Sequence, residues 1–199
     1  RSRHYKNTLQ VIYTFPNFLS WVIVGGLMTT IFAGEGVINS LIRASGGQTY
    51  GFLTDKSLIR PLLYATSIWK GTGWSAILYL AGIAGISPEL YEAAEVDGAN
   101  RFQCIRHITI PGLMPTYMVM LLMAIAGMLS NGMEQYLVFE NPQNSATIEV
   151  LDLYVYHSGI KSGLIPLSTV VGVFKSLIGV LLLFGANGIS KGVRGESII

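Results

Sequence analysis

The residues best suited to chemistry are spread thinly along this chain. Its three histidines, His4, His107 and His157, lie far apart and have none of the short spacings that metal ligands adopt. Asp152, His157 and a serine form a hydrolytic triad on paper, but no motif fixes their geometry. The pattern therefore favours surface or interface histidines over a metal site or an active site.

The printed sequence also lacks a phosphate-binding loop. Such a loop requires G-x-x-x-x-G-K-[ST], whose backbone N–H groups and lysine surround the phosphates. The nearest approach, residues 185–191, has Ser190 in place of the second glycine and ends an apolar run instead of following a strand. We therefore expect no cofactor in this chain, and expect any ATP and Mg²⁺ to be bound by a partner.

The composition indicates a protein of the lipid bilayer. Of 199 residues, 51% are hydrophobic and only 12% are charged, whereas soluble proteins have about a quarter charged residues. The net charge of +2 gives no electrostatic support for a nucleic-acid partner. The chain does not begin with methionine and has no signal-peptide pattern at Arg1, so it is expected to begin partway through a longer protein.

One polar, helix-prone segment, residues 87–111, lies between long apolar runs, and we call it the knuckle. Ser87 is suited to be an N-cap, Pro88 to be the first helical residue, and Glu89 to meet the positive end of the helix dipole. These residues predict a short helix over 88–97.

The second half of the knuckle begins at a glycine. Gly98 permits backbone conformations that a Cβ disfavours, and a second helical run is predicted over 99–108, ending at Pro111. The expected structure is a helix–turn–helix whose small residues allow another surface to approach closely: Ala93, Ala94, Gly98 and Ala99.

Seven residues of the knuckle occur at a fixed spacing. Glu92-Ala93-Ala94 is followed after three residues by Gly98, and after nine more by Ile108-x-Ile110-Pro111. This pattern resembles the EAA loop of the transmembrane subunits of ATP-binding-cassette importers, with Ile110 where leucine is commonest. Asp97-Gly98-Ala99 and Pro115 resemble the sugar-importing branch. The segments Phe15–Trp21 and Tyr154-Val155-Tyr156 resemble permeases for complex oligosaccharides.

The resemblance implies a permease subunit that forms the path for a sugar or oligosaccharide by alternating access. It implies a second, similar permease subunit as heterodimer partner, two ATPase subunits that hydrolyse the ATP, and an extracytoplasmic substrate-binding protein. The chain would be a transport subunit and not an enzyme, spanning a bacterial cell membrane several times, with further spans of the same protein expected upstream of this sequence. The residues expected to couple it to the ATPase are Glu92, Ala93, Ala94, Asp97, Gly98, Ile108 and Pro111.

Four apolar runs are each long enough to cross the bilayer, which takes ~20 helical residues. They cover about residues 11–33, 61–85, 113–133 and 164–187. The predicted fold is an all-α, polytopic membrane helical bundle, with residues 1–199 forming a single transmembrane domain.

The distribution of lysine and arginine favours a cytoplasmic knuckle. Four crossings put seven of these residues on the side of the knuckle and both termini, against four on the other side. The seven are Arg1, Arg3, Lys6, Arg101, Arg106, Lys191 and Arg194, and the four are Arg43, Lys56, Arg60 and Lys161.

Candidate residues for the substrate path combine aromatic faces and hydrogen-bonding groups, which sugars require. They are Asn131, Glu134, Gln135, Tyr136, Tyr154, Tyr156 and Lys70. The tyrosines equally suit an interfacial aromatic belt, and Lys70 equally suits pairing with a neighbouring helix or snorkelling to the headgroups.

Two other function classes stay open. One is a permease of the same architecture for amino acids, peptides or ions. The other is a membrane-embedded enzyme, which requires at least two of Glu134, Asp152 and His157 to converge in a cavity.

Overall fold

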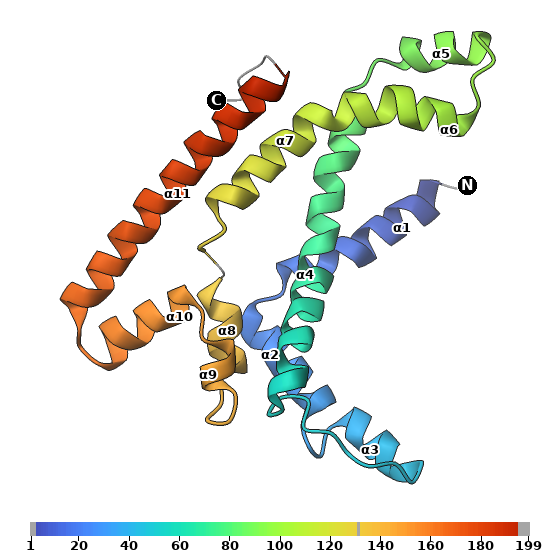
Figure 1. Ribbon diagram of the computed structural model, residues 1–199. Helices are drawn as coiled ribbons and strands as arrows, with labels where there is room; N and C mark the ends of the chain where they lie inside the picture. Colours follow the sequence, from blue (N-terminus) through green and yellow to red (C-terminus); the bar gives the residue numbers. More distant parts are fainter. Residues whose placement is uncertain (1–2, 131, 195–199) are drawn as a thin grey trace. The chain divides into compact units, whose positions relative to one another are not determined.

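The computed structural model describes residues 3–130 and 132–194, and within these ranges the chain forms helices joined by turns and loops, with no strand (Figure 1). Contacts divide it into two compact units. Unit 1 comprises Arg1–Gly73 and Leu129–Phe174, and unit 2 comprises Trp74–Met128 and Lys175–Ile199. The predicted all-α class is confirmed.

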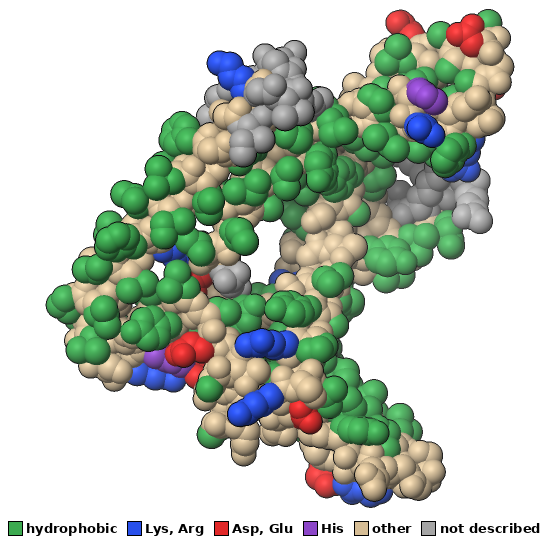
Figure 2. Space-filling model, in the orientation of Figure 1, with side chains coloured by type: hydrophobic (Ala, Val, Ile, Leu, Met, Phe, Trp, Pro, Cys, Tyr) green, Lys and Arg blue, Asp and Glu red, His purple; other side chains and the backbone are tan. Residues whose placement is uncertain are grey.

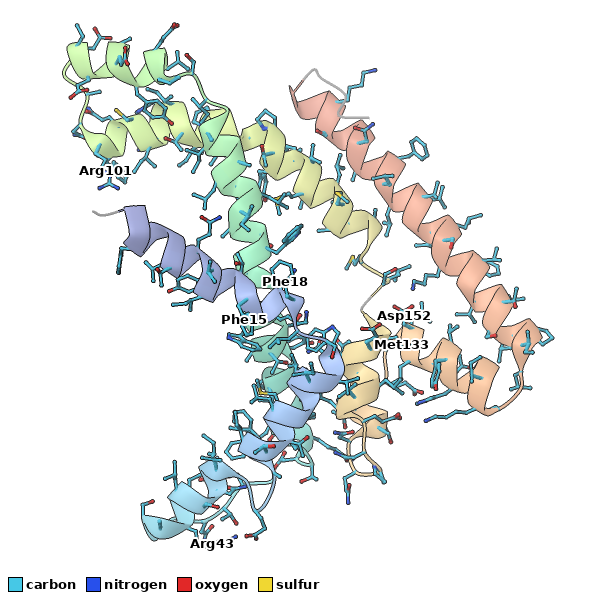
Figure 3. All side chains as sticks on the ribbon, turned by 180° about the vertical axis from the view of Figure 1, so that it is seen from behind. Phe15, Phe18, Arg43, Arg101, Met133 and Asp152 are labelled. Atoms are coloured by element: carbon cyan, nitrogen blue, oxygen red, sulfur yellow. The ribbon has the colours of Figure 1, made fainter. Side chains whose placement is uncertain are left out.

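The first predicted span is not a single helix. Unit 1 begins with α1 (Arg3–Thr14), a 3₁₀ turn η1 (Phe15–Phe18) and α2 (Trp21–Phe32). The α-helix ends here because Pro16 has no N–H to donate and Ser20 starts a new helix, its Oγ accepting the Ile23 N–H at 3.3 Å. Figure 3 shows this break, marked by Phe15 and Phe18.

A short amphipathic helix, α3 (Val37–Ala44), follows α2. Its buried Asn39 donates from Nδ2 to the carbonyls of Ala33 (3.0 Å) and Tyr50 (2.8 Å) and accepts the Tyr50 N–H. These bonds hold the loop before α4 against α3, while Val37 and Leu41 are exposed.

Helix α4 (Lys56–Ala84) begins five residues earlier than the second predicted span. Asp55 precedes it, and its carboxylate accepts the Ser57 N–H and hydroxyl at 2.7 Å. These hydrogen bonds lower the pKa of Asp55, because they stabilise its charged form.

Three stretches of the described residues are long and apolar enough to cross a membrane: Trp21–Ala44, Arg101–Ala126 and Ile165–Gly188. The four predicted spans are therefore not all supported by apolarity. Helix α4 has the length, at 29 residues, but it falls short in hydropathy because Lys70 and several Ser, Thr and Gly residues interrupt it.

The core of unit 1 forms where α4 meets the segment after residue 132. That segment contains α8 (Met133–Phe139), α9 (Ser145–Ile148), α10 (Leu151–Tyr156) and the π-helix η3 (His157–Lys161). Ile59 and Leu63 of α4 are buried against Phe139 and Ile148. Buried Asn144 closes the α8–α9 turn by donating to the carbonyls of Leu53 and Phe139, both at 2.9 Å.

Unit 2 contains the knuckle and the span that follows it. Its helices are the end of α4 from Trp74, α5 (Pro88–Val96), α6 (Arg101–Cys104), the π-helix η2 (Ile105–Thr109), α7 (Ile110–Ala126) and the part of α11 (Ile165–Arg194) from Lys175 onward. Hydrophobic side chains cover much of the exposed surface along α11 (Figure 2).

Two predicted boundaries in unit 2 are wrong. The second knuckle helix does not end at Pro111, because the chain continues directly from η2 into α7. In η2 the helix is wider by one residue per turn, with the Ile110 N–H donating to Ile105 O. Helix α7 then ends at Ala126 and not near residue 133, with the Gly127 N–H closing the last turn on Met123 O at 2.9 Å.

Candidate functional site

The turn of the knuckle is closed by backbone hydrogen bonds in a Schellman motif. Gly98 has a φ of +77°. Its N–H donates to Glu95 O at 3.0 Å, and the Ala99 N–H donates to Ala94 O at 2.9 Å. The predicted helix over 88–97 and the turn at Gly98 are confirmed, and the left-handed backbone explains the glycine.

A capping box opens the second arm of the knuckle. Asn100 Oδ1 accepts the N–H groups of Phe102 and Gln103 at 3.0 Å, and Gln103 Oε1 accepts the Asn100 N–H at 2.7 Å. The sequence reading missed it, although a cap residue followed three positions later by glutamine is its signature. The Schellman motif and the capping box together satisfy the backbone groups on both sides of the turn.

The two arms of the knuckle are also joined by side chains. The hydroxyls of Tyr91 on α5 and Thr109 on η2 share a hydrogen bond of 2.9 Å. Between the arms lies a pocket of about 310 Å³, lined by Ala94, Asp97, Gly98, Ala99, Gln103, Cys104, His107 and Ile108.

The outer surface of the knuckle combines carboxylates with exposed apolar side chains. Glu92, Ala93, Asp97 and Pro111 are exposed, and Ala94 and Ile108 are half-buried. Val96 and Phe102 are 88% and 71% exposed. Large apolar side chains at such exposure, beside acidic ones, are typical of a surface that contacts another protein.

Lys70 has a definite partner within unit 1. Its Nζ donates to Asn17 O at 2.7 Å and lies 5.4 Å from the centre of the Trp21 ring. Asn17 belongs to η1, where the break between α1 and α2 leaves carbonyls without helical partners. The structure therefore gives Lys70 the pairing role that the sequence reading weighed against the substrate path.

A second pocket, of about 300 Å³, lies within unit 1. Its lining residues are Arg60, Leu63, Tyr64, Tyr136, Thr147, Ile148, Glu149 and Val150. Arg60 donates from Nε and Nη2 to Thr147 O at 3.0 and 2.8 Å. Tyr136 is half-buried, and burial raises the pKa of its phenol.

The other substrate-path candidates do not gather with Tyr136. Gln135 is buried and donates to Leu63 O (2.8 Å) and Thr66 Oγ1 (3.1 Å), which is a structural tie between α8 and α4. Glu134 is exposed in the first turn of α8, Tyr154 is 40% exposed on α10, and the Tyr156 ring packs at a tilt on His157. Asn131 lies outside the described residues.

His157 pairs with charged residues nearby. Its Nε2 is 3.1 Å from Glu140 Oε2 and 3.0 Å from Lys161 Nζ, and its Nδ1 is 3.9 Å from Glu149 Oε1. The two pockets above are not lined by Glu134, Asp152 or His157. Within the described residues, no group of three or more His, Cys, Asp or Glu side chains could hold a metal ion.

Comparison with known proteins identifies the family to which this chain belongs. Residues 1–195 match the family model described as the binding-protein-dependent transport system inner membrane component. The chain belongs to this family.

Particular relatives share much of the sequence. Protein LplB of Bacillus subtilis is 42% identical over 199 residues, which is 100% of this chain and 63% of that protein. The polygalacturonan/rhamnogalacturonan transport system permease protein YteP of Bacillus subtilis is 39% identical over 195 residues, covering 98% and 61%. The chain thus spans less than two thirds of the length of these relatives.

A solved structure has the same fold. It is a bacterial ABC transporter involved in the import of the acidic polysaccharide alginate, with a TM-score of 0.90 and 34% identity, covering 98% of this chain and 68% of that one. A bacterial alginate ABC transporter in complex with an alginate pentasaccharide-bound periplasmic protein gives a TM-score of 0.91 at 33% identity, over 99% and 69%.

Proposed function

We propose that the full-length protein is a permease subunit of an ATP-driven importer and forms part of the path for a saccharide. The observation that carries this proposal is the knuckle, an exposed and internally braced helix–turn–helix with the residues expected at a coupling loop. The family match supports a transport role. The polygalacturonan/rhamnogalacturonan and alginate relatives support a saccharide substrate.

The knuckle would dock on a separate ATPase subunit at the cytoplasmic face. Closure of an ATPase pair would move the docked knuckle as a lever, and the spans would repack between outward-open and inward-open states. Glu92 would make a charged contact with the ATPase, and Gly98 would hold the turn. A second permease subunit, two ATPases and an extracytoplasmic binding protein complete the proposed assembly, and the alginate complex supports the last of these.

Four crossings remain our proposal, although hydropathy favours only three spans. The first turns of α4 contact α8 and α9 within unit 1, through Arg60 to Thr147 O and Gln135 to Leu63 O. If α7 crosses the membrane, α8 lies on the opposite side from the knuckle, so the start of α4 must lie there too. Helix α4 then has to cross to reach the knuckle.

The test is to reconstitute the full-length protein with the subunits encoded beside it and to measure ATPase activity stimulated by saccharide and binding protein. Gly98→Pro forces φ to about −65° where the turn needs a positive value, so we expect stimulation to be lost while assembly persists. Gly46, with a φ of +79° just after α3, gives a matched control. Gly46→Pro is expected to keep the coupling.

Undiminished stimulation in Gly98→Pro would contradict the lever. Stimulation of the wild-type complex by amino acids or peptides, but by no saccharide, would contradict the proposed substrate class.

A further inference from the structure

The pocket between α4 and α9, defined above by Arg60, Tyr64, Tyr136 and Glu149, has the groups that a saccharide requires. Its floor is rigid, because Leu63 and Ile148 are both 2% exposed and belong to the core of unit 1. Its rim is polar and accessible, with Tyr64 60% exposed. An apolar floor with aromatic and polar sides is typical of a small-ligand site.

The hydrogen-bonding groups on the rim are complementary to hydroxyl groups. Arg60, which lines the pocket, is held by two hydrogen bonds from Nε and Nη2 to Thr147 O. The Glu149 carboxylate is 45% exposed and its Oε1 is 3.9 Å from His157 Nδ1. A sugar hydroxyl donates and accepts at once, so a fixed donor facing the same pocket as an acceptor suits it.

The charges in this pocket offset each other. Arg60 contributes one positive and Glu149 one negative formal charge among the lining residues. The pocket therefore favours recognition of hydroxyls over recognition of a carboxylate. Its volume of about 300 Å³ is at the lower end for small-molecule sites, which suits one end of an oligosaccharide and not a long chain.

We propose that this pocket is a saccharide-binding subsite at the outward mouth of the path, where Arg60 and Glu149 bind hydroxyl groups and Tyr64 and Tyr136 offer aromatic faces. The inference rests on the proposed function. In the proposed four-crossing topology, residues 34–60 and 134–163 are on the other side of the membrane from the knuckle, so the subsite would meet substrate before the conformational change.

A subsite at the mouth determines how well substrate is captured and not how fast the cycle turns. In the reconstituted full-length complex, with maltotriose, galactotriose and trigalacturonate as probes, Arg60→Gln and Tyr64→Leu are expected to raise the half-saturating saccharide concentration about tenfold. Lys56→Gln, one turn earlier on α4 and outside the pocket lining, is the matched control. In the Lys56→Gln control, neither the half-saturating concentration nor the maximal ATPase rate is expected to change.

Binding can be read without turnover. In a Tyr64→Cys variant of the same complex, each saccharide is added before a thiol-alkylating reagent, and modification is quantified by peptide mass spectrometry. We expect a binding saccharide to protect position 64 and to leave position 48, in a separate Gln48→Cys variant of the same complex, alkylated as before.

Three results would overturn the subsite. One is an unchanged half-saturating concentration in both Arg60→Gln and Tyr64→Leu. Another is a lack of protection at position 64 by every saccharide that stimulates the complex. The third is protection by trigalacturonate alone, lost in Arg60→Gln, which would indicate carboxylate recognition. If no probe stimulates ATP hydrolysis and none protects position 64, the proposed saccharide function fails together with the subsite.

Discussion

Tyr91 and Thr109 illustrate how single side chains brace the knuckle. Neither belongs to the spaced motif, yet their hydroxyls are 2.9 Å apart and connect the two arms. The knuckle can act as the proposed lever only if the angle between its two helical arms is kept. The hydrogen bond between Tyr91 and Thr109 holds that angle, and no residue of the spaced motif makes this link.

We expect Tyr91→Phe to weaken coupling, because it removes one hydrogen bond worth about 1 kcal/mol and leaves the ring in place. The ratio of stimulated to basal ATPase activity should fall, while basal activity is retained. Tyr13→Phe, at a 63% exposed position on α1, is the control. An unchanged ratio in Tyr91→Phe would mean that the backbone motifs alone brace the knuckle.

The structure also assigns a role to the side chain of Lys70. A lysine inside an apolar helix is costly unless it is paired, and here Nζ meets the Asn17 carbonyl beside the Trp21 ring. The lysine thus satisfies a carbonyl that the helix break exposes.

Lys70→Met should destabilise the protein by about 2 kcal/mol, through loss of a charge-assisted hydrogen bond. The melting temperature of the full-length protein in lipid nanodiscs measures this, and Lys70→Arg should recover part of the loss. If Lys70→Met leaves the melting temperature unchanged but raises the half-saturating saccharide concentration, the substrate-path interpretation holds instead.

Among the elements, α4 is distinguished by its close approach to the break between α1 and α2. Gly73 is buried there, and a Cβ at this position would collide with the backbone of Tyr13 and Thr14. Backbone atoms cannot move aside as a flexible side chain can, so the absence of a side chain sets the distance between these elements.

Gly73→Ala is expected to cost about 1–3 kcal/mol by overpacking and to lower the melting temperature and the yield of folded protein. Gly71 lies two residues away on the same helix, and a Cβ added there would meet no neighbouring atom within 4 Å. Gly71→Ala should be neutral or slightly stabilising, because alanine favours helix. Equal effects of the two changes would argue against the close approach.

For the whole molecule, the number of crossings decides which surfaces would face the proposed ATPase and which would face the proposed binding protein. Hydropathy and contacts give different counts, since α4 is too polar by composition but its first turns contact α8 and α9. We propose four crossings on the basis of these contacts. Lys70 lowers the hydropathy of α4, but its ammonium group is paired with the Asn17 carbonyl and need not be exposed to lipid.

Single cysteines in the full-length protein test this topology. Gln48→Cys and Gln143→Cys lie at exposed positions on loops of unit 1, and Val96→Cys lies at the knuckle tip. In intact cells, a membrane-impermeant thiol reagent should label positions 48 and 143, and position 96 only after permeabilisation. Labelling of positions 48 and 96 from the same side would mean that α4 does not cross.

The sequence determined the class of fold and the knuckle, because these depend on local properties. Long apolar runs predict helices in a bilayer, and Pro88 and Gly98 specify a helix start and a turn within a few residues. Ser87 stands at the predicted N-cap position, but its side chain makes no capping hydrogen bond. The last span, predicted over 164–187 and observed within α11, was also readable from a single apolar run.

The tertiary structure alone decided which polar groups meet. Arg60 and Thr147 are 87 positions apart, and Lys70 and Asn17 are 53 apart. No periodicity or local motif encodes such pairs, because they depend on how helices pack. The pocket of Arg60, Tyr64 and Glu149 was therefore invisible in the sequence, whereas the turn at Gly98 was already readable there.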